Sequence, residues 1–410
     1  MNEHIFNWDN KIKIMKTDLV IFLVVFCTFE VSYFSFTALS IKLLYLVLQV
    51  FFIVWGLLNI FIKKKYEAID FYLILFLLLE FYSTFLNHEG MKELLLNTKG
   101  LLLLYVSFKW AFGLKPRVYI HTAAVYSLIL LVANTLSSIA CYPRGLFYYD
   151  QFAPSFLMGA DNTSTRTYIL SLAICFIDIA FRNLGKRKRI INLYTIGLLN
   201  FIVYVFLRDI GNGKMCAIVF VLAYIVFQVF HIQMPKKPMK KIVLGNYILF
   251  FIMVVFNRLD IFSFIIINIL HRDLTVTTRT TIWKITMDKI ASKPVLGNGY
   301  MSGEKFESML PSIIGINAHN TILMVTFIGG FALSVVFALI LFSFALKYDK
   351  KVLDKKLWMM PIAFLGMFLR SQVEGGDAAH LIAMVVLISS VLRYYKELNT
   401  ARNICVEVER

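Results

Sequence analysis

One arginine and one histidine, Arg279 and His319, stand in the longest polar interruption of a strongly apolar chain. His319 directly precedes an apolar run and is followed by Asn320, so we expect it at a helix boundary that water can reach. An imidazole has a pKa near neutrality and can accept the proton of a hydroxyl, which suits it to general base catalysis. The alternative is an interfacial histidine that only caps a helix or forms a hydrogen bond.

Three further cations lie near the ends of apolar runs, namely Arg208, Lys214 and Arg370. If the helices form a compact bundle, we expect these side chains and Arg279 to cluster at one face of the membrane. Guanidinium groups suit a pyrophosphate, because their paired N–H donors match its oxygens. The alternative is snorkelling to the interface or a simple ion pair, such as Arg370 with Glu374.

The elements that must position these residues are membrane-spanning helices. Of the 410 residues, 59% are hydrophobic and 16% are charged, and the mean hydropathy is +0.72. A hydrocarbon layer of about 30 Å needs about 20 apolar residues per helix. The sequence therefore predicts an all-α polytopic membrane protein with about 12 transmembrane helices, forming one integral membrane domain over residues 1–410. The runs are 18–36, 41–62, 69–86, 94–113, 118–140, 164–181, 191–207, 214–231, 243–256, 320–345, 357–371 and 378–393.

The net charge of +17 is a topology signal rather than a sign of nucleic-acid binding. Well over half of the 42 lysines and arginines fall in every second gap between the runs. Basic residues concentrate on the cytoplasmic side of membrane proteins, so this alternation predicts that both termini are cytoplasmic. Membrane lipids, including anionic ones, are the expected partners of the basic segments, and nucleic acid is not.

The sequence predicts no cofactor and no transition-metal site. Its five cysteines include no CxxC pair, and no HExxH motif or P-loop is present. A divalent cation held only by carboxylates stays open as an alternative. Of the acidic residues inside predicted spans, we interpret Asp178 as structural, and we leave Glu30 and Glu80 open.

Two outer segments are long enough to build a site, namely residues 141–163 and 257–319. In the second, residues 261–270 predict a short helix lying at the interface. Residues 277–290 predict a second surface helix, because Ile282, Ile285 and Ile290 recur at near-helical spacing. The run PVLGNGYMSG then predicts a turn. No internal repeat is visible, which disfavours transporter folds built from duplicated bundles.

Three motifs resemble the O-antigen polymerase and ligase superfamily, which includes Wzy-type capsule polymerases. They are RTTIW (279–283), KPVLGNGY (293–300) and AHNTILMVTFIGGFALSVVF (318–337). Fainter similarities are GNGKMCAIVFV (211–221), FLMGADNTSTRTY (156–168) and RSQVEGGD (370–377). The chain departs from the family at 213–214, where Gly213 replaces the usual small polar residue and Lys214 the usual arginine. A lysine binds phosphate as a point charge and lacks the guanidinium fork.

The resemblance implies a GT-C-like glycosyltransferase in the bacterial cytoplasmic (inner) membrane, with its active site on the outer face. Its substrate would be undecaprenyl-pyrophosphate-linked oligosaccharide, used as both donor and acceptor. A flippase and a chain-length co-polymerase would be its protein partners. His319 would take the proton of the attacking hydroxyl, and Arg279 would hold the pyrophosphate as negative charge grows on it. The remaining candidates would contact pyrophosphate or sugar, and they are Arg208, Lys214, Arg370, Asn320, Trp283, Asp161, Asn162 and Glu374.

Two other functions fit the same sequence. A ligase of this superfamily would transfer finished glycan to another acceptor, and the sequence does not separate the two acceptors. A flippase or transporter of lipid-linked oligosaccharide would carry its functional charges near the middle of the membrane and have short loops. Here the candidates crowd one rim, and one outer segment spans about 60 residues. A structural or sensory protein would leave His319 and Arg279 replaceable.

Overall fold

The computed structural model describes residues 8–64, 66–148, 154–182, 192–230, 232, 235–269, 278–310, 317–351 and 357–398. Within these ranges nearly all regular structure is helical, and the strands belong to one small antiparallel sheet. The expected all-α character is therefore confirmed at this level.

Every predicted apolar run contains a helix, and several of these helices end in a turn of π-helix. The helices of the runs are α1 (Trp8–Thr28) with α2 (Ser32–Thr37), α3 (Leu39–Ile62), α4 (Ala68–Asn87), α5 (Met91–Val106) with η1 (Ser107–Ala111), α6 (Pro116–Cys141), α7 (Asp161–Ala180), α8 (Leu193–Leu207), α9 (Gly211–Tyr224) with η3 (Ile225–Val229), α10 (Pro238–Phe250) with η4 (Phe251–Val255), α13 (Thr321–Lys351), α14 (Met359–Ser371) and α15 (Ala378–Arg393).

Five of the described helical segments are both long and apolar enough to cross a membrane, and they are α3, α4, α6, α10 with η4, and α13. α8, α9, α14 and α15 are shorter apolar helices. A membrane protein is supported at this level, whereas the number of spans stays a prediction.

Local sequence explains where several helices begin. Proline occupies the first turn of α6 and of α10, where its missing N–H leaves no helical hydrogen bond unmade. At α8 the Asn192 side chain accepts a hydrogen bond from the Thr195 amide at 3.0 Å, and the Thr195 hydroxyl accepts one from the Asn192 amide. Glu67 and Asp70 form the same reciprocal cap at α4.

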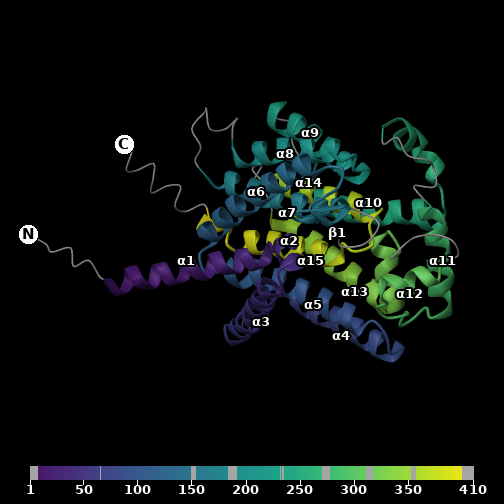
Figure 1. The fold of residues 1–410 in the computed structure, drawn as a ribbon, viewed down its shortest axis with the longest axis horizontal. Coiled ribbons are helices and arrows are strands. Elements are labelled where there is room, and N and C mark those ends of the chain that lie inside the picture. The colour runs from purple at the N-terminus through teal and green to yellow at the C-terminus, as the bar shows by residue number, and fades with distance from the viewer. Residues whose placement is uncertain are drawn as a thin grey trace, which may run out of the picture.

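α14 and α15 form the centre of the molecule. Figure 1 shows them, in yellow, surrounded by the earlier helices. Most side chains of both helices are buried. α14 packs against α7, α9 and α10, and α15 packs against α5 and α13. The link between these two central helices is therefore held inside the bundle at one end.

α13 is broken at Gly329 and Gly330, and the turn at residues 294–299 fills the break. Gly330 has φ 62° and ψ −163°, which is a glycine conformation. The amides of Asn298 and Gly299 donate to the carbonyls of Phe327 and Ile328, at 2.8 and 2.9 Å. In return, the amides of Phe331 and Ala332 donate to the carbonyls of Pro294 and Val295, at 2.8 and 3.2 Å. A broken helix is tolerated in hydrocarbon only when its freed backbone groups are satisfied in this way.

The segment expected at 257–319 contains several short helices. They are η5 (Leu259–Phe262), η6 (Phe264–Ile269), α11 (Arg279–Ser292) and α12 (Gly303–Ser308). The predicted helix over 277–290 is confirmed as α11 within the described residues, although α11 begins at Arg279, and the predicted turn follows it. Figure 1 shows α11 and α12 together at one edge of the molecule. The predicted short helix over 261–270 is divided between η5 and η6, with residue 270 outside the described ranges.

The segment expected as a loop at 141–163 contains strands that the sequence analysis did not predict. β1 (Phe147–Tyr148), β2 (Pro154–Phe156) and β3 (Gly159–Ala160) form an antiparallel sheet in the order β1-β2-β3. Ser155 pairs with Phe147 on one side and with Ala160 on the other. The sheet leads directly into α7, whose first residue is Asp161.

The segments that carry the basic residues meet at one end of the bundle. Lys347 Nζ lies 2.5 Å from a Glu67 carboxylate oxygen, and Lys109 pairs with Asp70. The carboxylate of Asp349 accepts from the amide of Met239 at 3.1 Å. We call this the basic end, formed where residues 63–64, 66–70, 109–117, 236–241, 347–351 and 393–398 meet. The side of the membrane that the basic end faces stays a prediction.

Candidate functional site

Glu374 lies at the centre of the candidate site, in the link between α14 and α15. Its Oε1 accepts hydrogen bonds from Asn212 Nδ2 at 3.0 Å and from Arg279 Nη2 at 3.2 Å. Its Oε2 lies 4.0 Å from His319 Nδ1. Its backbone carbonyl accepts from the Thr321 hydroxyl at 2.7 Å. One residue therefore joins α9, α11, the start of α13 and the α14–α15 link, through its carboxylate and its backbone carbonyl.

The structure thus brings the two predicted catalytic residues together. Arg279 is the first residue of α11, and His319 lies two residues before the start of α13. The turn at 294–299, which is hydrogen-bonded into the break of α13, fixes where α11 can lie. Trp283 anchors α11 in the core, since its side chain is 1% exposed and belongs to the same buried cluster as Ile282 and Ile290. Trp283 therefore acts on the site through the placement of α11.

His319 is held in an unusual backbone conformation. Its φ is 47°, in the left-handed region that non-glycine residues rarely adopt. The Asn317 side chain accepts a hydrogen bond from the His319 amide at 2.8 Å. Gly375 packs against this turn, because a Cβ there would lie 2.6 Å from Asn317 Oδ1. A strained turn retained beside charged groups is typical of functional sites.

The neighbour of His319 is fixed by a buried amide network. Asn320 is fully buried. Its Nδ2 donates to the backbone carbonyl of Gln372 at 3.0 Å and to Gln372 Oε1 at 3.2 Å. Gln372 Nε2 in turn donates to the Asn246 side chain of α10 at 2.5 Å. Because these side chains hydrogen-bond one to the next, the start of α13 is tied to α10 and to the end of α14. Asn320 therefore positions His319 by fixing the backbone next to it.

The electrostatic environment keeps His319 neutral. Burial of the ring, followed by the positive charge of Arg279, lowers the pKa of His319 to about 4. The imidazole is therefore unprotonated at neutral pH and can accept a proton. With the ring proton on Nδ1, facing Glu374, Nε2 would be the basic atom. The 4.0 Å separation from Glu374 is too long for a hydrogen bond, so that contact would have to shorten on substrate binding.

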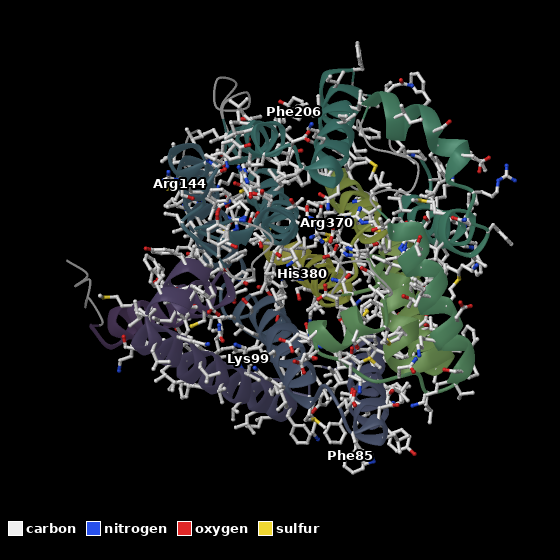
Figure 2. All side chains as sticks on the ribbon, turned by 45° about the vertical axis from the view of Figure 1, so that its right-hand side comes forward. Phe85, Lys99, Arg144, Phe206, Arg370 and His380 are labelled. Atoms are coloured by element: carbon white, nitrogen blue, oxygen red, sulfur yellow. The ribbon has the colours of Figure 1, made fainter. Side chains whose placement is uncertain are left out.

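Arg370 pairs with Asp377, rather than with Glu374 as the simple ion-pair alternative supposed. Both side chains are almost fully buried, at 3% and 1% exposed, and Arg370 Nη2 also donates to the carbonyl of Asn162. Glu374 is turned the other way, toward Arg279 and Asn212. Figure 2 shows Arg370 near the middle of the molecule, close to His380.

Arg208 and Asp161 form a two-pronged ion pair beside this cluster. Arg208 Nη2 and Nε lie 2.8 and 3.1 Å from Asp161 Oδ2. The guanidinium also stacks on the rings of Tyr142 and Phe156, each centred 4.5 Å away. Arg208 is 5% exposed, so it is already held by protein groups and would meet a ligand only if Asp161 moved. Asn162, the next residue, has an exposed side chain.

Lys214 pairs with Asp209 across the short turn between α8 and α9. Its amine lies 5.5 Å above the ring of Phe206, and its side chain is 13% exposed. Lys214 lies on the same helix as Asn212, which binds Glu374 directly. Of the predicted cations, Arg279 makes the direct contact to Glu374, whereas Arg208, Arg370 and Lys214 each pair with a separate aspartate.

Sequence analysis missed two residues of this cluster, Arg166 and His380. Arg166 Nη1 donates to the carbonyl of Gly376 at 3.4 Å, and its charge acts on Asp377. His380, in the first turn of α15, lies within the field of Arg166 and Arg370. Helical spacing could have indicated both residues. Arg166 follows Asn162 by four residues and His380 follows Asp377 by three, and residues so spaced lie on the same face of a helix.

Around the site, four arginines (166, 208, 279 and 370) face three carboxylates (Asp161, Glu374 and Asp377). The excess positive charge suits an anionic ligand. Within the described ranges, no group of three or more histidine, cysteine, aspartate or glutamate side chains is placed to hold a metal ion.

No family model matches this chain, and no curated protein matches it. The resemblance found in the sequence motifs therefore stays a hypothesis, and the functional argument depends on the geometry of the site.

Proposed function

We propose that this protein is a membrane glycosyltransferase that polymerises undecaprenyl-pyrophosphate-linked oligosaccharide repeat units into capsular, O-antigen or exopolysaccharide chains. The observation that carries the proposal is the convergence of His319, Glu374 and Arg279, three segments far apart in sequence, beside a cluster with excess positive charge. A neutral base next to an anion site is what transfer from a pyrophosphate leaving group needs.

The proposed reaction assigns one role to each group. His319 accepts the proton of the acceptor hydroxyl while its oxygen bonds to the anomeric carbon of the donor. The bond from that carbon to the pyrophosphate oxygen breaks, and undecaprenyl pyrophosphate leaves with the electron pair. Arg279 stabilises the charge that develops on the leaving group. The arriving pyrophosphate also opposes the effect of Arg279 on the imidazole, so it raises the pKa of His319 toward the working range of a base.

Glu374 would fix the positions of Arg279 and His319 relative to each other. Its Oε1 is bonded to Arg279 and Asn212, and its Oε2 faces His319. Once His319 takes the proton, the nearby carboxylate stabilises the imidazolium, as in other base–carboxylate pairs. Asp161, Asn162 and Arg166 surround the same cluster and are the proposed sugar and phosphate contacts.

We place this site on the outer face of the bacterial cytoplasmic membrane. The basic segments gather at the opposite end of the helices, and such segments favour the cytoplasmic side. Both termini would then be cytoplasmic, and the fold would be a GT-C-like bundle with about 12 spans. A flippase would deliver the substrate to this face, and a chain-length co-polymerase would be a second partner.

A ligase is the second candidate, because the same base and anion site would serve transfer to another acceptor. A flippase or other transporter is the third. The ion-paired cluster at one end of the helices favours chemistry over transport, since transport sites lie near the middle of the membrane.

Ladder formation tests the proposal. Purified protein in vesicles would be given lipid-linked oligosaccharide extracted from the source organism, and products would be separated on a gel. His319→Asn is the informative variant, because asparagine tolerates positive φ and removes the base. His88→Asn is its matched control, because His88 is exposed and also has positive φ, at 55°.

We expect a ladder from wild type and from His88→Asn, and none from His319→Asn. A ladder from folded His319→Asn would refute the assignment of the base. Transfer of one finished glycan without a ladder would favour the ligase. Movement of lipid-linked oligosaccharide across the vesicle membrane without any new glycosidic bond would favour the transporter.

A further inference from the structure

Glu80 carries a buried carboxyl group that the proposed reaction does not use. It lies in α4, one of the helices that are long and apolar enough to cross a membrane, and it is 4% exposed. Its Oε1 accepts a hydrogen bond from the Tyr300 hydroxyl at 2.9 Å. Among the described residues, this is the hydrogen bond that its carboxyl group makes. Whether the group is charged therefore depends on the cations around it.

No lysine, arginine or histidine of the described residues forms an ion pair with Glu80. α4 packs against α5, α13 and the turn at 294–299, and the lysines described on or beside these elements either bind other groups or are exposed. Lys99 donates to Gln49 at 2.7 Å, Lys347 donates to Glu67 at 2.5 Å, Lys293 donates to Asn87, Lys305 pairs with Glu89, and Lys92 and Lys350 are exposed. The titratable side chain that acts on Glu80 is Tyr300. A negative charge on Glu80 would therefore have no compensating cation.

A second buried carboxyl group of the same helix has such a cation. Asp70, in the first turn of α4, pairs with Lys109, and both side chains are less than a tenth exposed. Charged side chains within membrane spans are costly and almost always pair with one another. An isolated carboxylate in apolar surroundings is so unfavourable that the group takes up a proton instead. Burial without a cation therefore favours the neutral acid at Glu80.

The hydrogen bond from Tyr300 to Glu80 joins α4 to the turn at 294–299, which Tyr300 directly follows. The Tyr300 amide also donates to the Thr84 hydroxyl, one helical turn beyond Glu80, at 3.2 Å. Gly299 packs directly on α4, since a Cβ there would lie 2.9 Å from Thr84 Cα. The turn that fills the break of α13 and fixes the position of α11 thus lies against the part of α4 that carries Glu80.

We propose that Glu80 is a proton-binding site within the bundle, where a neutral carboxylic acid accepts a hydrogen bond from Tyr300. The bound proton takes the place of the cation that Lys109 supplies to Asp70. It allows the turn at 294–299 to pack against α4 without burying an unpaired charge. The site needs no substrate, so it is independent of the proposed glycan transfer.

Infrared spectroscopy tests this proposal directly, because a carboxylic acid and a carboxylate absorb at different frequencies. Spectra of the full-length protein in vesicles of neutral lipid would be recorded at neutral pH. The spectrum of Glu80→Gln would be subtracted from that of wild type. Asp70→Asn is the matched control, because it removes a buried carboxyl group of the same helix that is paired with a cation. Tyr300→Phe removes only the hydroxyl that binds Glu80.

We expect the band lost in Glu80→Gln to be that of a carboxylic acid, and the band lost in Asp70→Asn to be that of a carboxylate. In Tyr300→Phe the acid band should move to higher frequency, because the carbonyl group loses its hydrogen bond. A carboxylate band from Glu80 would overturn the proposal, whether water or a bound cation then holds the charge. An acid band that does not move in Tyr300→Phe would overturn the assigned partner.

Thermal unfolding of the same variants gives a second readout. Glu80→Gln should unfold close to the Tm of wild type, because an amide replaces a neutral acid and still accepts from Tyr300. Asp70→Asn should unfold several degrees lower, because it leaves Lys109 buried without its partner. A Tm for Glu80→Gln as low as that of Asp70→Asn would show that a charge is lost at Glu80, which would also overturn the proposal.

Discussion

Replacing Gly330 with alanine should destabilise the protein, because the break in α13 requires glycine. The residue has φ 62° and ψ −163°, and a Cβ there would lie 2.3 Å from the carbonyl carbon and oxygen of Val295. This backbone conformation costs a non-glycine residue about 1–3 kcal/mol. Displacing Val295 also breaks the hydrogen bond that its carbonyl accepts from the Ala332 amide, at about 0.5–1.5 kcal/mol. The total penalty is about 3 kcal/mol.

The matched control is Gly245→Ala in α10. A Cβ at Gly245 meets nothing within 4 Å, so alanine there should be neutral or stabilise the helix by up to about 1 kcal/mol. Thermal unfolding of both variants in detergent measures the difference. Gly330→Ala should unfold several degrees below wild type and lose glycan transfer, since Arg279 depends on the same turn. A Tm for Gly330→Ala equal to that of Gly245→Ala would refute the described break.

Three further predictions concern the site. Arg279→Gln should lower kcat by about 10²- to 10³-fold, as measured by turnover, because it removes charge stabilisation of the leaving group. It should also lower Tm in thermal unfolding, because the mostly buried Glu374 loses its ion-pair partner. For His319, the folded-state pKa is about 4 and the unfolded value is 6.5, so the unfolded state binds more protons between these pH values. Stability should therefore be constant above pH 6.5 and fall by up to about 3 kcal/mol as the pH drops to 4. Denaturant titrations should show this slope in wild type and not in His319→Asn. Gly375→Ala should slow turnover with little change in KM, because its Cβ would push Asn317 away from the His319 amide. Unchanged steady-state kinetics would contradict that role.

Hydropathy located most of the long helices, although the run at 18–36 is divided between α1, which begins at Trp8, and α2. α3, α4 and α15 begin and end within about two residues of the runs that predicted them. The small sheet before α7 was not predictable in the same way. Its strands have two or three residues each, and their pairing depends on the surrounding bundle.

The ion pairs within the site were harder to predict from the sequence than the residues that form it. Arg279 and His319 were expected to act together, and both lie beside Glu374. The sequence nevertheless suggested Arg370 with Glu374, whereas Asp377 is the partner found. The α14–α15 link decides this, since it turns Glu374 outward to Arg279 and keeps Asp377 against Arg370. Helical periodicity does not describe such a link, and distances across it are not visible in the sequence.

The central claim is that this site breaks the bond between a glycan and its lipid pyrophosphate. The most direct measurement counts undecaprenyl pyrophosphate released and glycosidic bonds formed in the same vesicles, by mass spectrometry. We expect one released lipid for each new bond, in wild type and His88→Asn alike, and at least a hundredfold slower release in His319→Asn. Equal rates of release in His319→Asn and wild type would contradict the account, as would glycan movement with no release at all.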